Sequence, residues 1–103
     1  MSRPDIRVII PAYNEENAVG LVIDEIPEGL VSEIIVVDNG STDNTAEIAQ
    51  KKGATVIPQT EKGYGNACLK GLEHIANRPK HPDIVVFLDG DHSDYPANGW
   101  SGV

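Results

Sequence analysis

The residues best suited to chemistry in this chain are Asp89 and Asp91, two carboxylates that flank one glycine directly after the apolar run 84–88. Both carboxylates can turn toward one cation when the small residue between them lets the backbone bend. Mg²⁺ and Mn²⁺ prefer oxygen ligands and commonly combine one or two carboxylates with substrate phosphates. The spacing therefore predicts a metal site at the end of a strand. A solvated acidic turn is the alternative.

A third carboxylate, Asp38, ends the apolar run 34–37 and precedes a polar segment. A carboxylate in this place can accept hydrogen bonds from ribose hydroxyls or from a base N–H. Alternatively, the segment is a turn in which Asn39 and Gly40 supply the bend and Asp43 caps the next helix. We favour the cap for Asp43 and the ligand role for Asp38, because a turn does not require aspartate at the strand end.

A glycine-rich segment at 62–67, which begins with Lys62, leads into an expected helix. Its backbone N–H groups and the helix dipole are suited to holding phosphate. The segment matches neither the Walker loop nor the dinucleotide fingerprint. An ordinary turn is the more common explanation of such a pattern.

The elements that must position these residues alternate between strands and helices. Strands buried on both faces are predicted by nearly continuous apolar runs at 8–10, 34–37 and 84–88. A weaker run at 54–57, stopped by Pro58, is typical of an edge strand. Apolar residues at helical spacing predict helices at 19–26, around 46–49 and from about 66 to 76.

Strands that alternate with helices in this way indicate an α/β fold with an open, mainly parallel sheet. In such sheets ligands bind beyond the carboxyl ends of the strands, which is where the polar segments above are expected to lie. The last helix is predicted to bury one face, formed by Cys68, Leu72, Ile75 and Ala76.

Composition and charge narrow the class of protein. Of 103 residues, 40% are hydrophobic and 23% are charged, which is typical of a globular domain. Eight Lys and Arg against 16 Asp and Glu give a net charge of −8. A surface with this charge repels the phosphates of a nucleic-acid duplex, so we expect no nucleic-acid partner. A nucleotide can still bind, because a metal ion and backbone dipoles act locally.

Two further expectations concern the cellular setting. Cys68 is the only cysteine, so an intrachain disulfide is impossible and a reducing, cytoplasmic location is expected. The longest apolar run, 84–88, is far shorter than the roughly 20 residues that a membrane span needs, so no span is expected.

Four motifs together resemble the family 2 glycosyltransferases of the GT-A fold. In chain order they are VIIPAYNEE at 8–16, EIIVVDNGSTD at 33–43, GYGNA at 63–67 and FLDGD at 87–91. Within that family the chain most resembles the dolichyl- or polyprenyl-phosphate sugar transferases. The resemblance extends over about residues 6–96 and corresponds to the Rossmann-like, nucleotide-binding half of such an enzyme.

The resemblance implies a UDP- or GDP-sugar donor and a divalent metal, Mg²⁺ or Mn²⁺. The residues that match the family's nucleotide-binding positions are Pro11, Tyr13, Glu15, Asp38, Gly63 and Asn66. Asp89 and Asp91 match the D-x-D pair that holds the metal on the diphosphate. Ser93 stands where the lipid-phosphate sugar transferases often have a further metal ligand, and it is a weaker ligand.

The resemblance also implies a division of the chain. Residues 1–96 would form the nucleotide-sugar-binding part of a truncated domain, followed by an atypical tail at 97–103. The parent reaction would transfer a sugar from the donor to a lipid-phosphate or saccharide acceptor. Without the acceptor half, this chain is expected to have little activity. A non-catalytic nucleotide-binding or interaction module is the alternative.

A sheet cut after its fourth sequential strand would leave a central strand at the edge, with unpaired N–H and C=O groups. Edges of this kind favour pairing between copies of a chain. We therefore expect a homo-oligomer.

Overall fold

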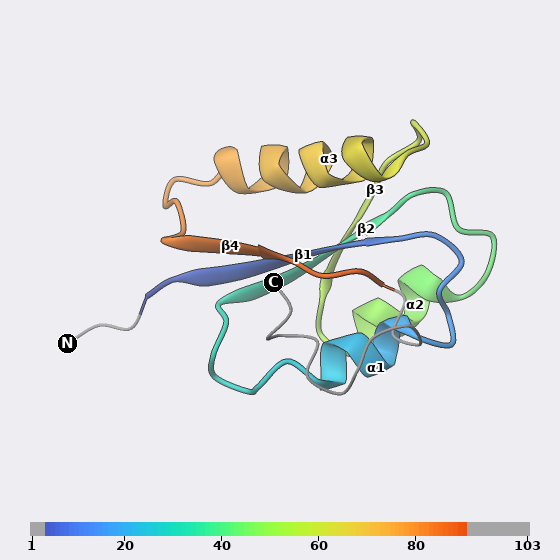
Figure 1. Cartoon of the computed structure of the whole chain (residues 1–103), viewed down its shortest axis with the longest axis horizontal. Helices are drawn as coiled ribbons and strands as arrows, with labels where there is room; N and C mark the ends of the chain where they lie inside the picture. The colour runs from blue at the N-terminus through green and yellow to red at the C-terminus, as the bar shows by residue number, and fades with distance from the viewer. Residues whose placement is uncertain (1–3, 91–103) are drawn as a thin grey trace.

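Strands and helices alternate along residues 4–90, the part of the chain that the computed structural model describes (Figure 1). The elements are β1 (Ile6–Ala12), α1 (Val19–Asp24), β2 (Glu33–Asp38), α2 (Thr45–Lys51), β3 (Thr55–Pro58), α3 (Tyr64–Ala76) and β4 (Ile84–Phe87). The predicted order of elements is confirmed. The predicted domain boundary between 96 and 97 lies outside the described residues.

The strands form one parallel sheet in the order β3-β2-β1-β4. β1 is central: Ala12 is level with Asp38 of β2 on one side, and Ile9 is level with Phe87 of β4 on the other. The chain first adds strands on the β2 side of β1, and then crosses over through α3 to add β4 on the opposite side. The sheet therefore changes its winding direction at β1, which is the point where open α/β sheets bind ligands.

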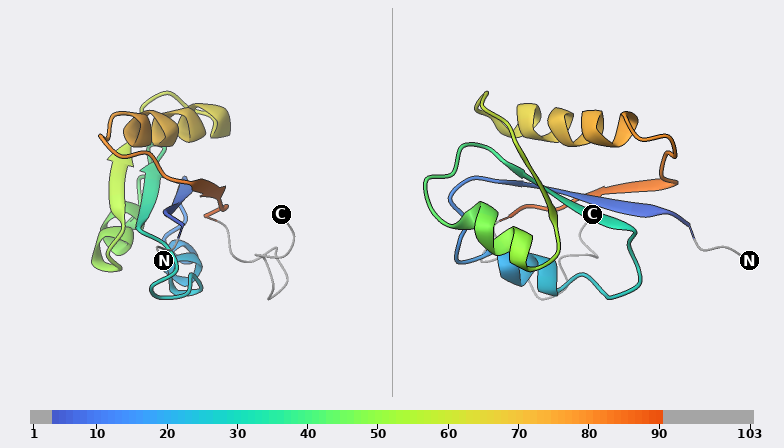
Figure 2. Two further views of the ribbon diagram at one scale, coloured as in Figure 1. Left: turned by 90° about the vertical axis from the view of Figure 1, so that its left-hand side faces the viewer. Right: turned by 180° about the vertical axis from the view of Figure 1, so that it is seen from behind.

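Helices cover both faces of the sheet, with α3 on one face and α1 and α2 on the other (Figure 2). The alternating side chains of β1 serve both layers. Val8 and Ile10 pack with α1, whereas Ile9 packs with α3, and all three are fully buried. This explains why the run in β1 is apolar at every position rather than at every second one. No helix within residues 4–90 combines the length and apolar character needed to cross a bilayer.

The sheet-facing side of α3 differs from the prediction. Ala67, Gly71 and Ile75 are buried, whereas Leu72 is 39% exposed; Ala76 is also exposed and Cys68 is half-buried. The reason is close packing: a Cβ on Gly71 would lie 2.7 Å from Cγ2 of Ile9. The small residues let the helix lie close to β1 and turn its leucines outward.

Helix α1 is also shorter than predicted and ends at Asp24. Ile26 remains buried, but it directly precedes Pro27. The proline ring disfavours the helical conformation in the residue before it, so the helix stops short of Ile26.

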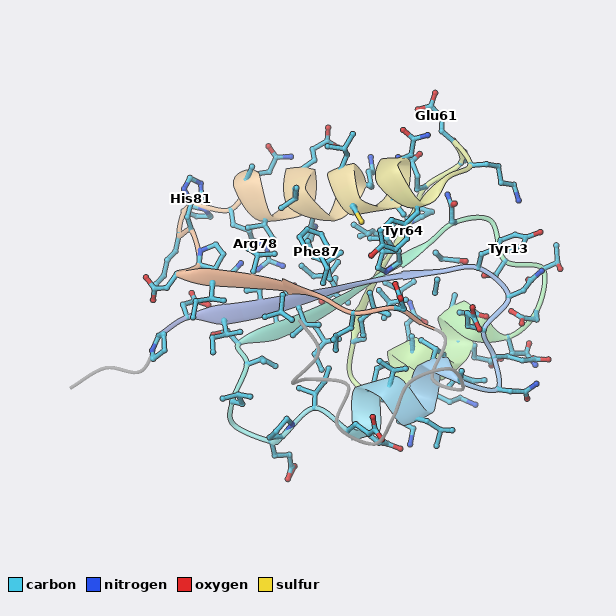
Figure 3. All side chains as sticks on the ribbon, viewed as in Figure 1. Tyr13, Glu61, Tyr64, Arg78, His81 and Phe87 are labelled. Carbon is cyan, nitrogen blue, oxygen red and sulfur yellow. The ribbon has the colours of Figure 1, made fainter. Side chains whose placement is uncertain are left out.

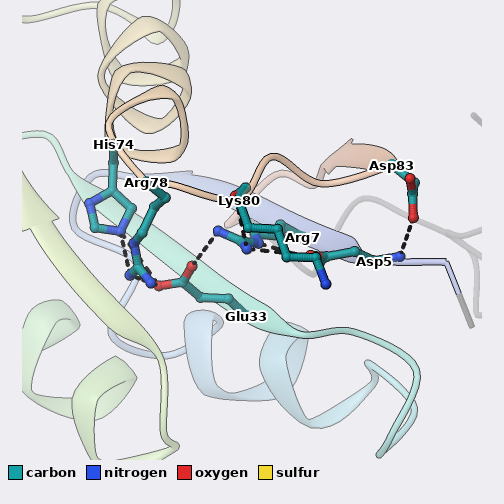
Figure 4. A network of polar contacts seen from close by, with 7 residues as sticks. All are labelled: Asp5, Arg7, Glu33, His74, Arg78, Lys80 and Asp83. Atoms are coloured by element: carbon teal, nitrogen blue, oxygen red, sulfur yellow. Dashed lines mark hydrogen bonds and ion pairs between the residues drawn. The ribbon is translucent and has the colours of Figure 1, made fainter. Parts of the chain in front are cut away.

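A network of charged side chains lies at the amino end of the strands (Figure 4). Glu33 accepts hydrogen bonds from Arg78 Nη2 at 2.7 Å and from Arg7 Nη1 at 3.5 Å, and His74 Nε2 lies 3.5 Å from the same carboxylate. Arg7 is only 7% exposed and also pairs with Asp5. These contacts tie β1, β2 and α3 together at the end of the sheet opposite the predicted site.

Candidate functional site

The loops that follow β1, β2 and β3 gather at the carboxyl end of the sheet. Figure 3 shows Tyr13, Glu61 and Tyr64 toward this end, and Arg78 and His81 toward the other. The topology brings together here the predicted donor residues Pro11, Tyr13, Glu15, Asp38, Gly63 and Asn66, with Asp89 at the end of β4. Asp91, the second member of the predicted metal pair, lies outside the described residues.

The loop after β1 is joined to the loop after β2 by Asn14, which has a positive φ of 52°. The Asn14 N–H donates to Ser41 Oγ at 2.9 Å, and its side-chain Oδ1 accepts from the Thr42 N–H at 2.8 Å. The Glu15 N–H donates to Thr45 Oγ1 at 2.8 Å. These bonds fix the backbone of both loops beside the predicted nucleoside residues.

Asp38 is half-buried, and its Oδ1 accepts a hydrogen bond from the Ser41 N–H at 2.9 Å. The carboxylate therefore stabilises the turn, as in the alternative interpretation of this residue. An ionised carboxylate has about four acceptor positions, so this bond leaves capacity for a ligand. The structural role and the ligand role are compatible.

Asp43 supports the start of α2 from one residue before the N-cap, Asn44. Its carboxylate accepts from the Thr45 N–H at 3.0 Å, from the Glu16 N–H at 3.2 Å and from the Thr45 hydroxyl. Burial raises the pKa of Asp43, but the hydrogen bonds from Thr45 and Glu16 outweigh it and lower the pKa. The predicted role at the helix start is thus played by side-chain bonds to Thr45 rather than by the N-cap residue itself.

Asn39 joins the loop after β2 to the loop after β3, whereas the sequence pattern indicates only a turn residue. Its side-chain amide donates to Gln59 O at 3.0 Å and to Glu61 O at 2.8 Å, and its Oδ1 accepts from the Gly63 N–H at 3.0 Å. Asn39 is 7% exposed. The partners are 20 to 24 residues away in sequence, so the local turn pattern contains no signal for these bonds.

The third side of the site is closed by Lys62, whose Nζ lies 4.1 Å from the centroid of the Tyr13 ring. Lys62 O accepts a hydrogen bond from Asn66 Nδ2 at 2.9 Å. Asn66, which is predicted to bind the nucleotide, therefore also secures the start of α3. Gly63 has a φ of 123°, which L side chains rarely adopt. The three loops are thus linked pairwise into a closed ring around the end of the sheet.

The segment after β4 approaches the end of β1 very closely at Gly90. A Cβ on this residue would lie 3.1 Å from Pro11 O and 3.2 Å from Ala12 Cβ, which explains the glycine between the two aspartates. Asp89 faces Tyr64, the first residue of α3. Burial, together with the charge of Asp89, raises the pKa of Tyr64 to about 12. Tyr64 therefore keeps its proton at neutral pH and can donate to the Asp89 carboxylate.

The residues around Asp89 do not form a complete metal cage: within 4–90 no three His, Cys, Asp or Glu side chains are grouped to hold an ion. Mg²⁺ sites commonly have few protein ligands and take the rest from substrate phosphates and water. Asp89 fits that kind of site because it provides a hard oxygen ligand at the carboxyl end of the sheet.

Comparisons with known proteins agree with the fold and the motifs. A dolichyl-phosphate hexose transferase from Haloferax volcanii is 44% identical over 95 residues, which cover 89% of this chain and 38% of that protein. Protein RfbJ of Shigella flexneri is 39% identical over 88 residues, which cover 84% of this chain and 64% of that protein. The chain therefore spans less than two thirds of the length of either relative.

A solved structure confirms the predicted GT-A-type α/β fold. Glucosyl-3-phosphoglycerate synthase from Mycobacterium tuberculosis, crystallised with Mn²⁺, UDP and glucosyl-3-phosphoglycerate, matches with a TM-score of 0.72 and 38% identity. The match covers 85% of this chain and 34% of that one. The family model described as Glycosyl transferase family 2 matches residues 7–98. This chain belongs to glycosyl transferase family 2.

Proposed function

We propose that residues 1–96 form the donor-binding part of a glycosyltransferase, which takes a UDP- or GDP-sugar together with Mg²⁺ or Mn²⁺. The observation that carries the proposal is the ring of three linked loops at the switch point of the sheet, with Asp89 beside it. The similar synthase from Mycobacterium tuberculosis was crystallised with Mn²⁺ and UDP, which supports the same ligand class for this chain.

The proposed roles follow from the position of each residue. Pro11, Tyr13 and Glu15 line the nucleoside, and Asp38 accepts hydrogen bonds from it. Asp89 and Asp91 would hold the metal, which when bound stabilises negative charge on the departing nucleoside diphosphate. At a net charge of −8 the carboxylates would otherwise repel a diphosphate, so binding is expected to depend on the cation.

The acceptor is proposed from the relatives and not from a site among residues 4–90. One relative is a dolichyl-phosphate hexose transferase, which favours a lipid phosphate, and a saccharide is the other candidate. A phosphate acceptor needs little help from a base, whereas a sugar hydroxyl needs a carboxylate to take its proton. We assign no described residue to that step.

We also propose that copies of the chain associate and that it works in the cytoplasm. Within residues 4–90, β4 has a neighbouring strand on one side only, and its Ile84 is 44% exposed. The single cysteine is consistent with a reducing compartment. Light scattering of the purified chain tests the first proposal: a dimer or larger species supports it, and a monomer at high micromolar concentration contradicts it.

Calorimetric titration with UDP and GDP, with and without Mn²⁺, tests the donor site. Asp38→Asn preserves an acceptor for the Ser41 N–H but removes the charge, so affinity should fall about tenfold or more with or without metal. Asp89→Asn should instead abolish most of the gain from Mn²⁺ without weakening metal-free binding, because it also removes a charge that repels the diphosphate. Glu28→Gln is the matched control, because it removes one charge from an exposed loop at the other end of the sheet.

The proposal fails if the unmodified chain binds neither UDP nor GDP in the presence of Mn²⁺. The residue assignments alone fail if the chain binds nucleotide but both aspartate variants behave like Glu28→Gln.

A further inference from the structure

Lys62 occupies an unusual electrostatic position. Within residues 4–90 it is the only lysine or arginine in the loops that follow the carboxyl ends of the strands. The same end of the sheet carries several carboxylates: Glu15, Glu16, Asp38, Asp43, Glu61 and Asp89. An anionic ligand that enters this end of the sheet would therefore meet one cationic side chain in the described part of the chain.

The side chain of Lys62 lies between the loops after β1 and β2. Its Nζ is 4.1 Å from the Tyr13 ring centroid and 3.4 Å from the place where a Cβ on Gly40 would be. Gly40 has a φ of 88° and no side chain, so the ammonium group has room over the turn. Such an exposed cation–π contact is weak, so a ligand can displace it.

The backbone of Lys62 is held while its ammonium group remains accessible. Asn39 binds Glu61 O and the Gly63 N–H, at 2.8 and 3.0 Å, on either side of Lys62. Asn66 donates to the carbonyl of Lys62 itself at 2.9 Å. The exposed side chain can therefore exchange the Tyr13 ring for a ligand without movement of the loop.

The strand order shows which part of a nucleotide Lys62 would meet, given the proposed donor site. Gly40 follows β2 and Lys62 follows β3, whereas Asp89 follows β4 on the opposite side of β1. A diphosphate held by metal at Asp89 would therefore place the nucleoside toward β2, beside Tyr13 and Asp38. The ammonium group lies at this nucleoside end.

We propose that Lys62 determines base specificity by donating a hydrogen bond to a carbonyl oxygen on the edge of the base. This inference rests on the proposed donor-binding function. Uracil and guanine carry a carbonyl oxygen where cytosine and adenine carry an amino group. An ammonium group has donors only, so it pairs with the carbonyl and opposes the amino group.

The test is calorimetric titration of the whole chain with UDP, CDP, GDP and ADP at one Mn²⁺ concentration. The unmodified chain should bind UDP about tenfold more tightly than CDP, and GDP about tenfold more tightly than ADP. Lys62→Met keeps the length of the side chain but cannot donate, so the two members of each pair should become equal. Lys62→Arg should retain the preference, because it keeps the donors and the positive charge.

Lys51→Met is the control for the lost positive charge, since Lys51 is exposed at the end of α2 and pairs only with Glu47 in the described residues. It should leave all four affinities unchanged. An equal loss for all four nucleotides in Lys62→Met would overturn the inference and indicate a phosphate contact. Equal binding of UDP and CDP to the unmodified chain would also overturn it. Absence of binding to both UDP and GDP would instead contradict the proposed function, and this inference with it.

Discussion

Asn39→Ala should destabilise the protein strongly, although the change is small and lies in a loop. The substitution removes three hydrogen bonds, to Gln59 O, Glu61 O and the Gly63 N–H. Each such bond contributes about 0.5–1.5 kcal/mol net. Glu61 and Gly63 are exposed, so water can replace the lost partner, and the net values apply rather than the full cost of burying unpaired groups. The expected loss is about 3 kcal/mol, a large share of the roughly 5–15 kcal/mol that stabilises a domain.

Urea denaturation followed by circular dichroism measures this loss as a lower midpoint at an unchanged slope. Asn77→Ala is the matched control: Asn77 is exposed at the C-cap of α3, and the change should alter stability by less than about 0.5 kcal/mol. A loss below about 0.5 kcal/mol in Asn39→Ala would refute the reasoning, because it would mean that the bonds between the loops contribute nothing net.

Two further predictions concern α3. Gly71→Ala places a Cβ 2.7 Å from Ile9 Cγ2, and the resulting overpacking, roughly 1–3 kcal/mol, should exceed the roughly 1 kcal/mol gained in helix propensity. Urea denaturation should therefore show that Gly71→Ala is destabilised. Gly65→Ala, whose Cβ meets nothing within 4 Å, should be neutral or stabilising in the same assay. A stabilised Gly71→Ala would contradict the close packing. The raised pKa of Tyr64 means that its protonated form stabilises the fold below pH 10, an effect lost as the pH rises to about 12. The pH titration of phenolate absorbance, compared between the unmodified chain and Tyr64→Phe, isolates the contribution of Tyr64. Its midpoint should lie near pH 12, and a midpoint near 10.0 would contradict the environment described for this side chain.

Local patterns were sufficient to predict the fold. The β-branched runs of β1 and β2 are buried on both faces, and the short run of β3 ends at Pro58 on the edge of the sheet. The prediction that the run 84–88 is also buried on both faces is wrong for the described residues, because β4 has a neighbouring strand on one side only and is half-buried, with Ile84 44% exposed. Burial of these strands is determined by consecutive residues, which a sequence displays directly. The same patterns placed the predicted donor-binding residues after the strands; Pro11 and Asp38 instead lie in the last residues of β1 and β2, and parallel pairing brings the whole set to one end of the sheet.

Contacts between distant segments could not be predicted in this way. The sequence pattern predicts only a turn role for Asn39, although its amide joins two loops, and it does not predict the contact of Lys62 with the Tyr13 ring. Leu72 was expected to be buried, but the small side of α3 faces β1 instead. In each case the outcome depends on how closely two elements pack, and no short stretch of sequence encodes that distance.

Nuclear magnetic resonance with UDP and Mn²⁺ tests most directly whether nucleotide and metal bind together at the carboxyl end of the sheet. Bound Mn²⁺ broadens the signals of nearby amides in the spectrum of the nitrogen-15-labelled chain. With UDP present, broadening should be strongest at Asp89 and Gly90 and extend to the loops at Tyr13 and Gly40. The amide signals at the amino end of the strands, near Arg78, should stay sharp. Broadening centred on the amino end, or spread evenly over the exposed carboxylates, would contradict the proposed donor site.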